Sequence, residues 1–524
     1  MSKTTQGSFI KLNNEEFYKI ANYDCMEDFF MTMISASDIW NFCWSQGGLT
    51  AGRIDCDHAV FPYYTADKVK DAKSYTGPHT EITVKTSSST EIWKPFEEID
   101  SSLLDSNDFE RNLYKNVPGT KIIFEEINKK LNLAFRYCWT SSAKFGLVRK
   151  ATIENLSSSP VELSVLDGCK NILPACVTAD FQNNNSVLLD AYKKTELDPE
   201  SNLAIFTVSS IVTDKAEPNE GLYANTCWFN TNDTPILDLD EKAATISRGK
   251  RPACFIEKNI SLAGNASETW YQVFDTYLDS CRVADLTAKL ADKAALTKEL
   301  EIDIEDGTKA IMSRIAEADG IQETAEKSTT IHHSANVLFN IMRGGIFANG
   351  GKIDVEDFIK STAVRNKAGA KELASLLQSK GINGLVDYST LKNAIFTDDG
   401  CPQAKRLFLE YMPLTFSRRH GDPSRPWNRF AIKIQNPDGS QVLNYEGNWR
   451  DIFQNWEALV WSYPEYIENM CGKFLNAMTI DGFNPYRITR QGIDWEVPEP
   501  DNPWAQIGYW GDHQVIYFEK LLEF

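Results

Sequence analysis

The first half of the chain carries short alternating or apolar runs that end at Gly, Pro, Asn, Asp or Ser. Alternation with a period of two places apolar side chains on one face of a strand, so these runs predict β-strands. Representative runs are Glu81–Lys85, Lys121–Phe124, Leu131–Tyr137, Phe145–Ile153, Val161–Leu166 and Leu203–Val208. Because no helical pattern separates them, residues 1–282 predict an antiparallel β-sandwich.

The apolar spacing becomes helical from residue 283 onward. Residues 283–329 are rich in Ala, Leu, Lys and Glu, which predicts a helical linker that fixes the relation of two domains. From residue 330 the helical runs alternate with long loops that carry Arg, Trp, Asp, Gly and Pro, which is typical of functional loops. The predicted helices are His332–Arg343, Ala368–Ser379, Gln403–Tyr411, Trp449–Trp461 and Pro464–Met478.

A last predicted helix, Asp512–Phe524, ends the chain without a Gly or Pro stop signal. It carries an apolar stripe of Val515, Phe518, Leu521 and Leu522. Such a stripe normally packs against a neighbouring helix, so we expect residues 330–524 to form the first part of a larger helical domain. Apolar area left in water costs about 25 cal/mol per Å². The chain alone is therefore expected to be poorly soluble or inactive unless a second polypeptide completes the domain.

Length, charge and cysteine content narrow the class of protein. A chain of 524 residues predicts two or three domains. The net charge of −19 argues against nucleic acid as a partner and mostly favours solubility. We expect neither a signal peptide nor a membrane span, because no run of about 18 apolar residues occurs. Eleven cysteines without a Cys-x-x-Cys pair favour a reduced, cytoplasmic protein with no metal or cofactor.

Tryptophan is concentrated near the end of the chain, where seven of the thirteen residues lie between positions 427 and 510. Flat aromatic rings cover the apolar faces of sugars, which favours a carbohydrate ligand. Trp456 and Trp461 lie on helical faces and are expected in the core. The residues beside charged loop positions, expected to line a pocket, are Trp427, Trp449, Trp495 and Trp510.

A basic segment, Ser417–Arg429, stands out in this acidic chain. Arginine forks match phosphate or carboxylate, so the segment predicts a phosphate site. A solvated loop that pairs with nearby acids is an equally supported alternative. The residues assigned to phosphate are Arg418, Arg419, His420 and Arg425.

Acidic residues able to act on a glycosidic bond follow this basic segment. Cleavage of such a bond generally requires a carboxylic acid and a nucleophile on the opposite face of the sugar. Asp512, beside His513, is the first candidate, although a helix N-cap role is equally compatible with its position. The catalytic candidates are Asp512, Glu446 and Glu496. The substrate-binding candidates are Trp427, Trp449, Arg450, Asp451, Gln454, Asn455, Asp494, Trp495, Trp510 and His513.

Two segments of the predicted sandwich, Ser45–Arg53 and Ala59–Tyr64, are also distinctive. Their glycines lack the spacing of a phosphate-binding or dinucleotide-binding loop, which excludes a nucleotide interpretation. We interpret them as a structured loop that packs at a domain junction, with direct substrate contact as the alternative.

The order and sizes of these parts resemble the inverting glycoside phosphorylases of the cellobiose and chitobiose phosphorylase type. The segment Trp449–Asn455, followed by Pro464 and Glu465, looks like the Arg-Asp-x-x-Gln-Asp helix of that family. The match places Arg450 and Asp451 at the donor sugar, while Asn455 stands where the family has an acid. The run Trp510–Gln514 is similar to the entry of the helix before the catalytic segment of the family. The Gly-Asp-Trp-Asn-like segment with the general acid is absent from residues 330–524.

The resemblance implies a galactose-mutarotase-like sandwich, a helical linker and an incomplete (α/α)6 barrel, assembled as a homodimer. It also implies phosphorolysis of a β-linked disaccharide or oligosaccharide, in which inorganic phosphate attacks the anomeric carbon and gives a sugar 1-phosphate. A glycoside hydrolase of the same architecture and a non-catalytic carbohydrate-binding protein are the alternatives.

Overall fold

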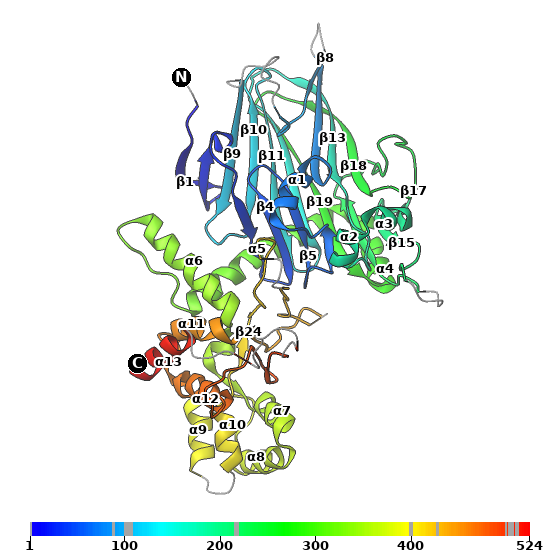
Figure 1. Cartoon of the computed structure of the whole chain (residues 1–524). Helices are drawn as coiled ribbons and strands as arrows, with labels where there is room; N and C mark the ends of the chain where they lie inside the picture. Colours follow the sequence, from blue (N-terminus) through cyan, green and yellow to red (C-terminus); the bar gives the residue numbers. More distant parts are fainter. Residues whose placement is uncertain are drawn as a thin grey trace. The chain divides into compact units, whose positions relative to one another are not determined.

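The computed structural model describes residues 3–85, 90–98, 108–213, 219–397, 402–425, 429–436, 438–497, 500, 508 and 513–524. The chain divides into two compact units, a β-rich unit and a helical unit (Figure 1). The β-rich unit comprises residues 1–311 and 421–429, and the helical unit comprises residues 312–420 and 430–524. The division falls inside helix α5 (Lys293–Glu317), which begins within the predicted linker.

The β-rich unit contains one large antiparallel sheet and two small ones, as the alternating pattern predicts. The large sheet is, in order, β1 (Gln6–Leu12), β2 (Glu15–Ala21), β9 (Phe109–Asn116), β10 (Ile122–Asn128), β11 (Leu133–Ser142), β12 (Gly146–Asn155), β19 (Ser267–Leu278), β16 (Ala224–Phe229), β15 (Ala204–Val208), β14 (Lys193–Leu197) and β17 (Ile246–Arg248). The small sheets are β18 (Ala253–Leu262), β13 (Val161–Lys170), β7 (Gly77–Lys85) and β8 (Thr90–Trp93), and β3 (Phe30–Met33), β4 (Ile39–Trp44), β5 (Leu49–Arg53) and β6 (Ala59–Phe61).

The inward faces of these sheets share one core, which confirms the predicted sandwich. Trp139 and Phe274 of the large sheet pack with Phe61 and Val165 of the small sheets, and all four are buried. Each large apolar side chain buried in this way contributes about 1.5–3 kcal/mol. A second core lies on the outer face of the large sheet, where helix α4 (Ser280–Lys289) and the first half of α5 cover it. Its central residues are Trp228, Tyr271, Leu286, Leu300 and Ile304.

Short helices interrupt the β-rich unit, contrary to the expectation that no helices intervene. They lie in connections between strands and are too short to show a helical period in the sequence. These helices are η1 (Tyr23–Cys25), α1 (Ala66–Asp71), η2 (Ala72–Ser74), α2 (Ala179–Asn184) and α3 (Ser186–Tyr192), whereas η4 (Leu290–Asp292) joins α4 to α5 within the predicted linker.

Gly146 begins β12 in a backbone conformation that other residues rarely adopt. Its φ is +102°, and a Cβ atom at this position would lie 2.1 Å from the Phe274 oxygen. Strain and the steric clash together predict that Gly146→Ala lowers the free energy of unfolding by about 1–3 kcal/mol. Urea denaturation measures the loss, with Gly249→Ala as the control. Gly249 also has a positive φ of +68° but nothing within 4 Å of its Cβ position. Equal losses in the two variants would contradict a contribution from the Phe274 contact.

The helical unit confirms the predicted helices, with ends shifted by a few residues. Its helices are α6 (Lys327–Gly344), α7 (Val355–Arg365), α8 (Lys367–Ser379), α9 (Tyr388–Phe396), α10 (Pro402–Phe408), α11 (Trp449–Leu459), η6 (Pro464–Tyr466), α12 (Ile467–Ala477) and α13 (His513–Glu523). The sequence interpretation missed α7 and α9. Short strands and one further turn of helix lie between them, namely β20 (Ile346–Phe347), η5 (Ala348–Gly351), β21 (Ile353–Asp354), β22 (Leu385–Val386), β23 (Leu414–Thr415), β24 (Glu446–Asn448), β25 (Arg487–Thr489) and β26 (Ile493–Asp494).

The apolar stripe of the last helix finds neighbours inside the helical unit. Helix α13 packs against α11 and α12. The Phe518 ring stacks on Phe474 with centroids 4.4 Å apart, and Leu521 is buried. The expectation that the whole stripe waits for another helix is therefore wrong, although Leu522 remains exposed. Among the described helices, none has the length and apolar character needed to cross a membrane.

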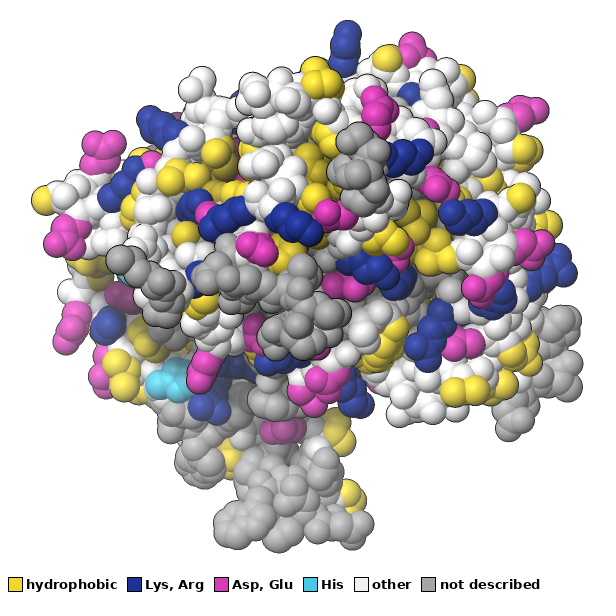
Figure 2. Space-filling model, turned by 90° about the horizontal axis from the view of Figure 1, so that it is seen from above, with side chains coloured by type: hydrophobic (Ala, Val, Ile, Leu, Met, Phe, Trp, Pro, Cys, Tyr) yellow, Lys and Arg dark blue, Asp and Glu magenta, His cyan; other side chains and the backbone are white. Residues whose placement is uncertain are grey.

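Acidic and basic side chains are interspersed on the molecular face shown in Figure 2. The large negative net charge of the sequence does not gather there into one acidic field. This distribution agrees with the interpretation that the charge mainly favours solubility.

Candidate functional site

A small antiparallel sheet in the helical unit brings several predicted residues together. Strand β25 lies between β24 and β26, and Arg487 of β25 is opposite Asp494 of β26. The Arg487 guanidinium donates from Nη1 to Glu446 Oε1 at 2.8 Å and from Nε to Asp494 Oδ2 at 2.7 Å. Arg419 Nε lies 3.8 Å from the same Glu446 oxygen. One guanidinium therefore joins two carboxylates that are far apart in the sequence.

The environment of these carboxylates limits what they can do chemically. Glu446 Oε1 and Asp494 Oδ2 both accept hydrogen bonds from Arg487, which orients the two carboxylates. This arrangement suits the orientation of a polar ligand. Glu496 is exposed and makes no hydrogen bond or ion pair with other described residues.

Helix α11 presents three of the predicted residues to solvent. Arg450, Asp451 and Gln454 are exposed, and the Asp451 carboxylate lies 3.2 Å from His513 Nε2 of α13. Asn455 is instead buried, where its amide donates to Asn340 Oδ1 at 3.0 Å. Its predicted role in direct sugar contact is therefore wrong for this arrangement.

Two tryptophans of this region lie where the sequence interpretation did not expect them. Trp449 was expected to line a pocket at the start of its helix, but it is fully buried against Phe453 and Phe474. Trp461 was expected in the core, but 72% of it is exposed. The core prediction for Trp456 is confirmed, and its indole donates to the Gly344 oxygen at 2.9 Å.

Trp495 is half-buried beside Asp494. A Cβ atom on Gly508 would lie 3.1 Å from the Trp495 ring, so the glycine permits close packing there. The predictions for Trp427, Trp510 and Asp512 lie outside the described residues.

The basic segment does not form one described cluster. Arg418, Arg419 and His420 belong to the helical unit, whereas Arg425 belongs to the β-rich unit. The Arg418 guanidinium lies over the Phe416 ring at 5.0 Å. Within the β-rich unit, Arg429 pairs with Asp180, and the Ala66 amide donates to the Pro423 oxygen at 2.9 Å. Arg419 and Arg429 therefore pair with acidic residues, and the assignment of the basic segment to phosphate stays a prediction.

A second polar cluster of the helical unit was not predicted. The Arg490 side chain pairs with Asp357 of α7 and donates to the Leu443 oxygen at 2.7 Å. Tyr411 donates to the same Asp357 carboxylate at 2.5 Å, and burial together with this carboxylate raises the pKa of Tyr411. Tyr411 and Arg490 also line, together with Lys473, a cavity of about 10 Å³, which is about the space of one water molecule. The residues of the cluster lie up to 133 residues apart, so no local sequence signal reveals the cluster.

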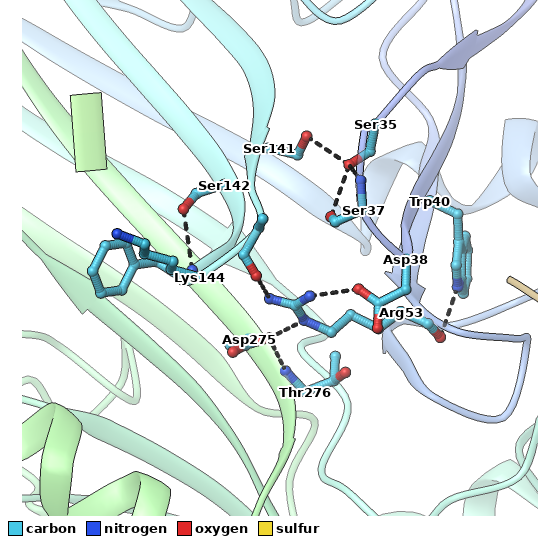
Figure 3. A network of polar contacts seen from close by, with 12 residues as sticks. Ser35, Ser37, Asp38, Trp40, Arg53, Ser141, Ser142, Lys144, Asp275 and Thr276 are labelled. Carbon is cyan, nitrogen blue, oxygen red and sulfur yellow. Dashed lines mark hydrogen bonds and ion pairs between the residues drawn. The ribbon is translucent and has the colours of Figure 1, made fainter. Parts of the chain in front are cut away.

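The glycine-rich segment of the sandwich is a strand rather than the predicted loop. Residues Leu49–Arg53 form β5. The buried Arg53 guanidinium binds Asp275 at 2.5 Å, Asp38 at 2.6 Å and the Ala143 oxygen at 3.0 Å (Figure 3). The Trp40 indole donates to the Arg53 oxygen at 3.1 Å. This network fixes β5 to the neighbouring strands and has a structural role.

Comparisons with known proteins give only distant likenesses. No protein-family model and no curated protein matches the chain. A bacterial glucoamylase solved with acarbose has a TM-score of 0.34 and 9% identity, and the match covers 90% of this chain and 71% of the glucoamylase. A protein assigned as kojibiose phosphorylase from the human microbiome has a TM-score of 0.24 and 8% identity, and the match covers 89% of this chain and 45% of that protein. A protein assigned as aldose 1-epimerase from Klebsiella pneumoniae has a TM-score of 0.23 and 9% identity, and the match covers 56% of this chain and 92% of that protein. Likenesses at these TM-scores do not establish a family or an activity.

Proposed function

We propose that this chain acts on carbohydrates and binds a disaccharide or oligosaccharide at the sheet β24–β25–β26 of the helical unit. The observation that carries the proposal is the Arg487 guanidinium held between Glu446 and Asp494. Sugar hydroxyls both donate and accept, so carboxylates and a guanidinium side by side offer them matched partners. Trp495, half-buried next to Asp494, adds an apolar ring suited to the face of a sugar.

The reaction we propose is inverting phosphorolysis of a β-linked disaccharide or oligosaccharide with inorganic phosphate. Its support is the helix that resembles the donor-sugar helix of the cellobiose and chitobiose phosphorylases. Arg450 and Asp451 lie exposed on the first turn of this helix, where a ligand can reach them. Arg419 beside Glu446 adds a second cation near the carbohydrate site. Phosphate binding there needs such cations.

Non-catalytic carbohydrate binding is the second candidate function. It is favoured by the finding that Arg487 binds both Glu446 and Asp494, so that both carboxylates are already engaged in ion pairs. A hydrolase needs two suitably placed carboxyl groups, one of them protonated.

The experiment that separates these functions assays a panel of β-linked disaccharides with and without inorganic phosphate. The 524-residue chain is assayed in both conditions. We expect phosphate-dependent formation of a sugar 1-phosphate. Free sugars formed without phosphate would establish a hydrolase instead, and saturable binding without turnover would establish a binding protein. The absence of both binding and turnover with every glycan tested would overturn the proposed function.

A further inference from the structure

A large cleft in the β-rich unit is not used by the proposed function. Its volume is about 690 Å³, which lies in the range of small-molecule sites. The lining comes from the segment before β3, the turn after β4, α1 and η2, β7, the segment after β8, the middle of β11 and the end of β13. Gln46 and Gly47 of the glycine-rich segment are among the lining residues.

The floor of the cleft contains the hydroxyl of Tyr137, a residue that is itself largely buried. Tyr137 is 3% exposed, and its ring stacks on Phe124 with centroids 5.0 Å apart. Its hydroxyl makes no hydrogen bond to any other described residue. A Cβ atom on Gly47 would lie 3.4 Å from this oxygen, so the glycine keeps the space above it narrow but open. Burial raises the pKa of Tyr137, which keeps the hydroxyl protonated as a donor.

The Tyr137 hydroxyl lies beside Gly47, which also lines the cleft, so a ligand in the cleft can reach it. The Arg149 guanidinium packs over the Tyr137 ring, 5.0 Å from the ring centroid, and helps to hold the ring in place. Arg149 in turn is held by Asp167. The hydroxyl therefore cannot easily turn toward another partner, and a ligand atom in the cleft would satisfy it.

One wall of the cleft is strained. Phe96 has a φ of +65°, which is rare for an aromatic residue. Its amide donates to Glu126 Oε2 at 2.9 Å, and the buried Glu126 also accepts from Trp93 and Arg111 at 2.7 Å. Strain of this kind persists where the surroundings impose it, and it is concentrated at ligand sites. The Phe96 ring packs on Tyr137 at 5.2 Å and so forms an apolar flank beside the hydroxyl.

Some charged side chains of the cleft form ion pairs with described residues, and others do not. Lys70 pairs with Asp28 at 2.9 Å, and His79 lies 3.5 Å from Glu97. Lys73 and Lys170, which are half-buried, have no ion pair with another described residue. Burial lowers the pKa of both lysines. The remaining acidic lining residues, Asp71 and Glu98, are exposed. An anionic group that enters the cleft would therefore meet two cations whose charge is poorly solvated.

We propose that this cleft binds a small acidic sugar, in which one anionic group pairs with Lys73 and Lys170 and a ring oxygen or hydroxyl accepts from Tyr137. The aromatic flank of Phe96 suits the apolar edge of a sugar ring. The anionic group can be a carboxylate, as in a sugar acid, or a phosphate, as in a sugar phosphate. The site lies in a different unit from the sheet β24–β25–β26 and does not depend on the proposed reaction.

Isothermal titration calorimetry on the 524-residue chain tests this site with D-glucuronate, D-glucose 6-phosphate, uncharged D-glucose and inorganic phosphate as separate probes. We expect one of the two acidic sugars to bind at least about tenfold more tightly than D-glucose and than inorganic phosphate, a difference of about 1.4 kcal/mol. The acidic sugar that binds more tightly identifies the anionic group. Equal affinity for D-glucose, or binding of inorganic phosphate alone, would overturn the proposal.

Three substitutions locate the binding in the cleft. Lys73→Gln and Lys170→Gln should each weaken the acidic sugar about tenfold, and Tyr137→Phe should weaken it several-fold while keeping the buried ring. Lys130→Gln is the matched control, because Lys130 is exposed, pairs with Glu91 and does not line the cleft. Circular dichroism spectra confirm that each variant is folded. Unchanged affinity in both lysine variants would place the ligand elsewhere and overturn the site.

Discussion

Asp167→Asn is expected to lower the free energy of unfolding by about 3–5 kcal/mol, the largest stability effect that we predict. Asp167 and Arg149 are both completely buried, and the guanidinium binds the carboxylate at 2.7 and 2.8 Å. The carboxylate also accepts from the Trp270 indole at 2.7 Å and from Thr80 at 2.6 Å. Asparagine keeps the shape of the side chain but leaves the Arg149 cation buried without a counter-charge. Urea denaturation followed by tryptophan fluorescence measures the loss.

The control for this prediction is an ion pair on the surface of the same unit. Lys130 and Glu91 lie 3.0 Å apart with both side chains exposed. Exposed pairs contribute between 0 and about 1 kcal/mol, so Glu91→Gln should have little effect. A loss of less than about 1 kcal/mol in the free energy of unfolding for Asp167→Asn would show that the buried pair does not stabilise the sandwich to the extent predicted.

Arg487→Met is expected to weaken binding of a β-linked glycan by roughly 10- to 100-fold, the largest functional effect that we predict. The substitution removes the group that holds Glu446 and Asp494 in place, and it leaves two carboxylates that repel each other. Affinity is measured by titration calorimetry with the tightest-binding disaccharide of the panel.

The control for Arg487→Met is Arg406→Met. Arg406 is a surface arginine of α10 that pairs with Glu410 and does not touch the sheet β24–β25–β26. We expect its substitution to leave the affinity within about twofold of the natural value. Equal losses in the two variants would indicate a general effect of lost positive charge rather than a site at the sheet.

The helical pattern around Trp449 explains both a success and a failure of the sequence analysis. Trp449, Ile452, Phe453 and Trp456 recur at the spacing of one helix face, and all four are buried. That spacing alone places Trp449 in the core. Charged neighbours on the chain do not decide the matter, because adjacent residues of a helix point in different directions. Trp461 lies beyond the end of α11, where the helical spacing no longer applies.

The polar site depends on pairings that no local pattern encodes. Glu446 and Arg487 are 41 residues apart and meet only because β24 pairs with β25. The glycine-rich segment was misread as a loop for a related reason. Gly52 lies within β5, and a Cβ atom there would be 2.3 Å from the His58 oxygen, so the close packing of this strand requires glycine. Glycine can therefore mark close packing inside a strand as well as a turn. The sandwich and most helices could be predicted, because their periodicity is local.

Hydrogen–deuterium exchange with and without a saturating β-linked disaccharide tests the carbohydrate site most directly. The account predicts protection of backbone amides in residues 446–450 and 487–494, with no change in the strands of the β-rich unit. Protection confined to other segments, or bound disaccharide without any protection at β24, β25 and β26, would contradict it.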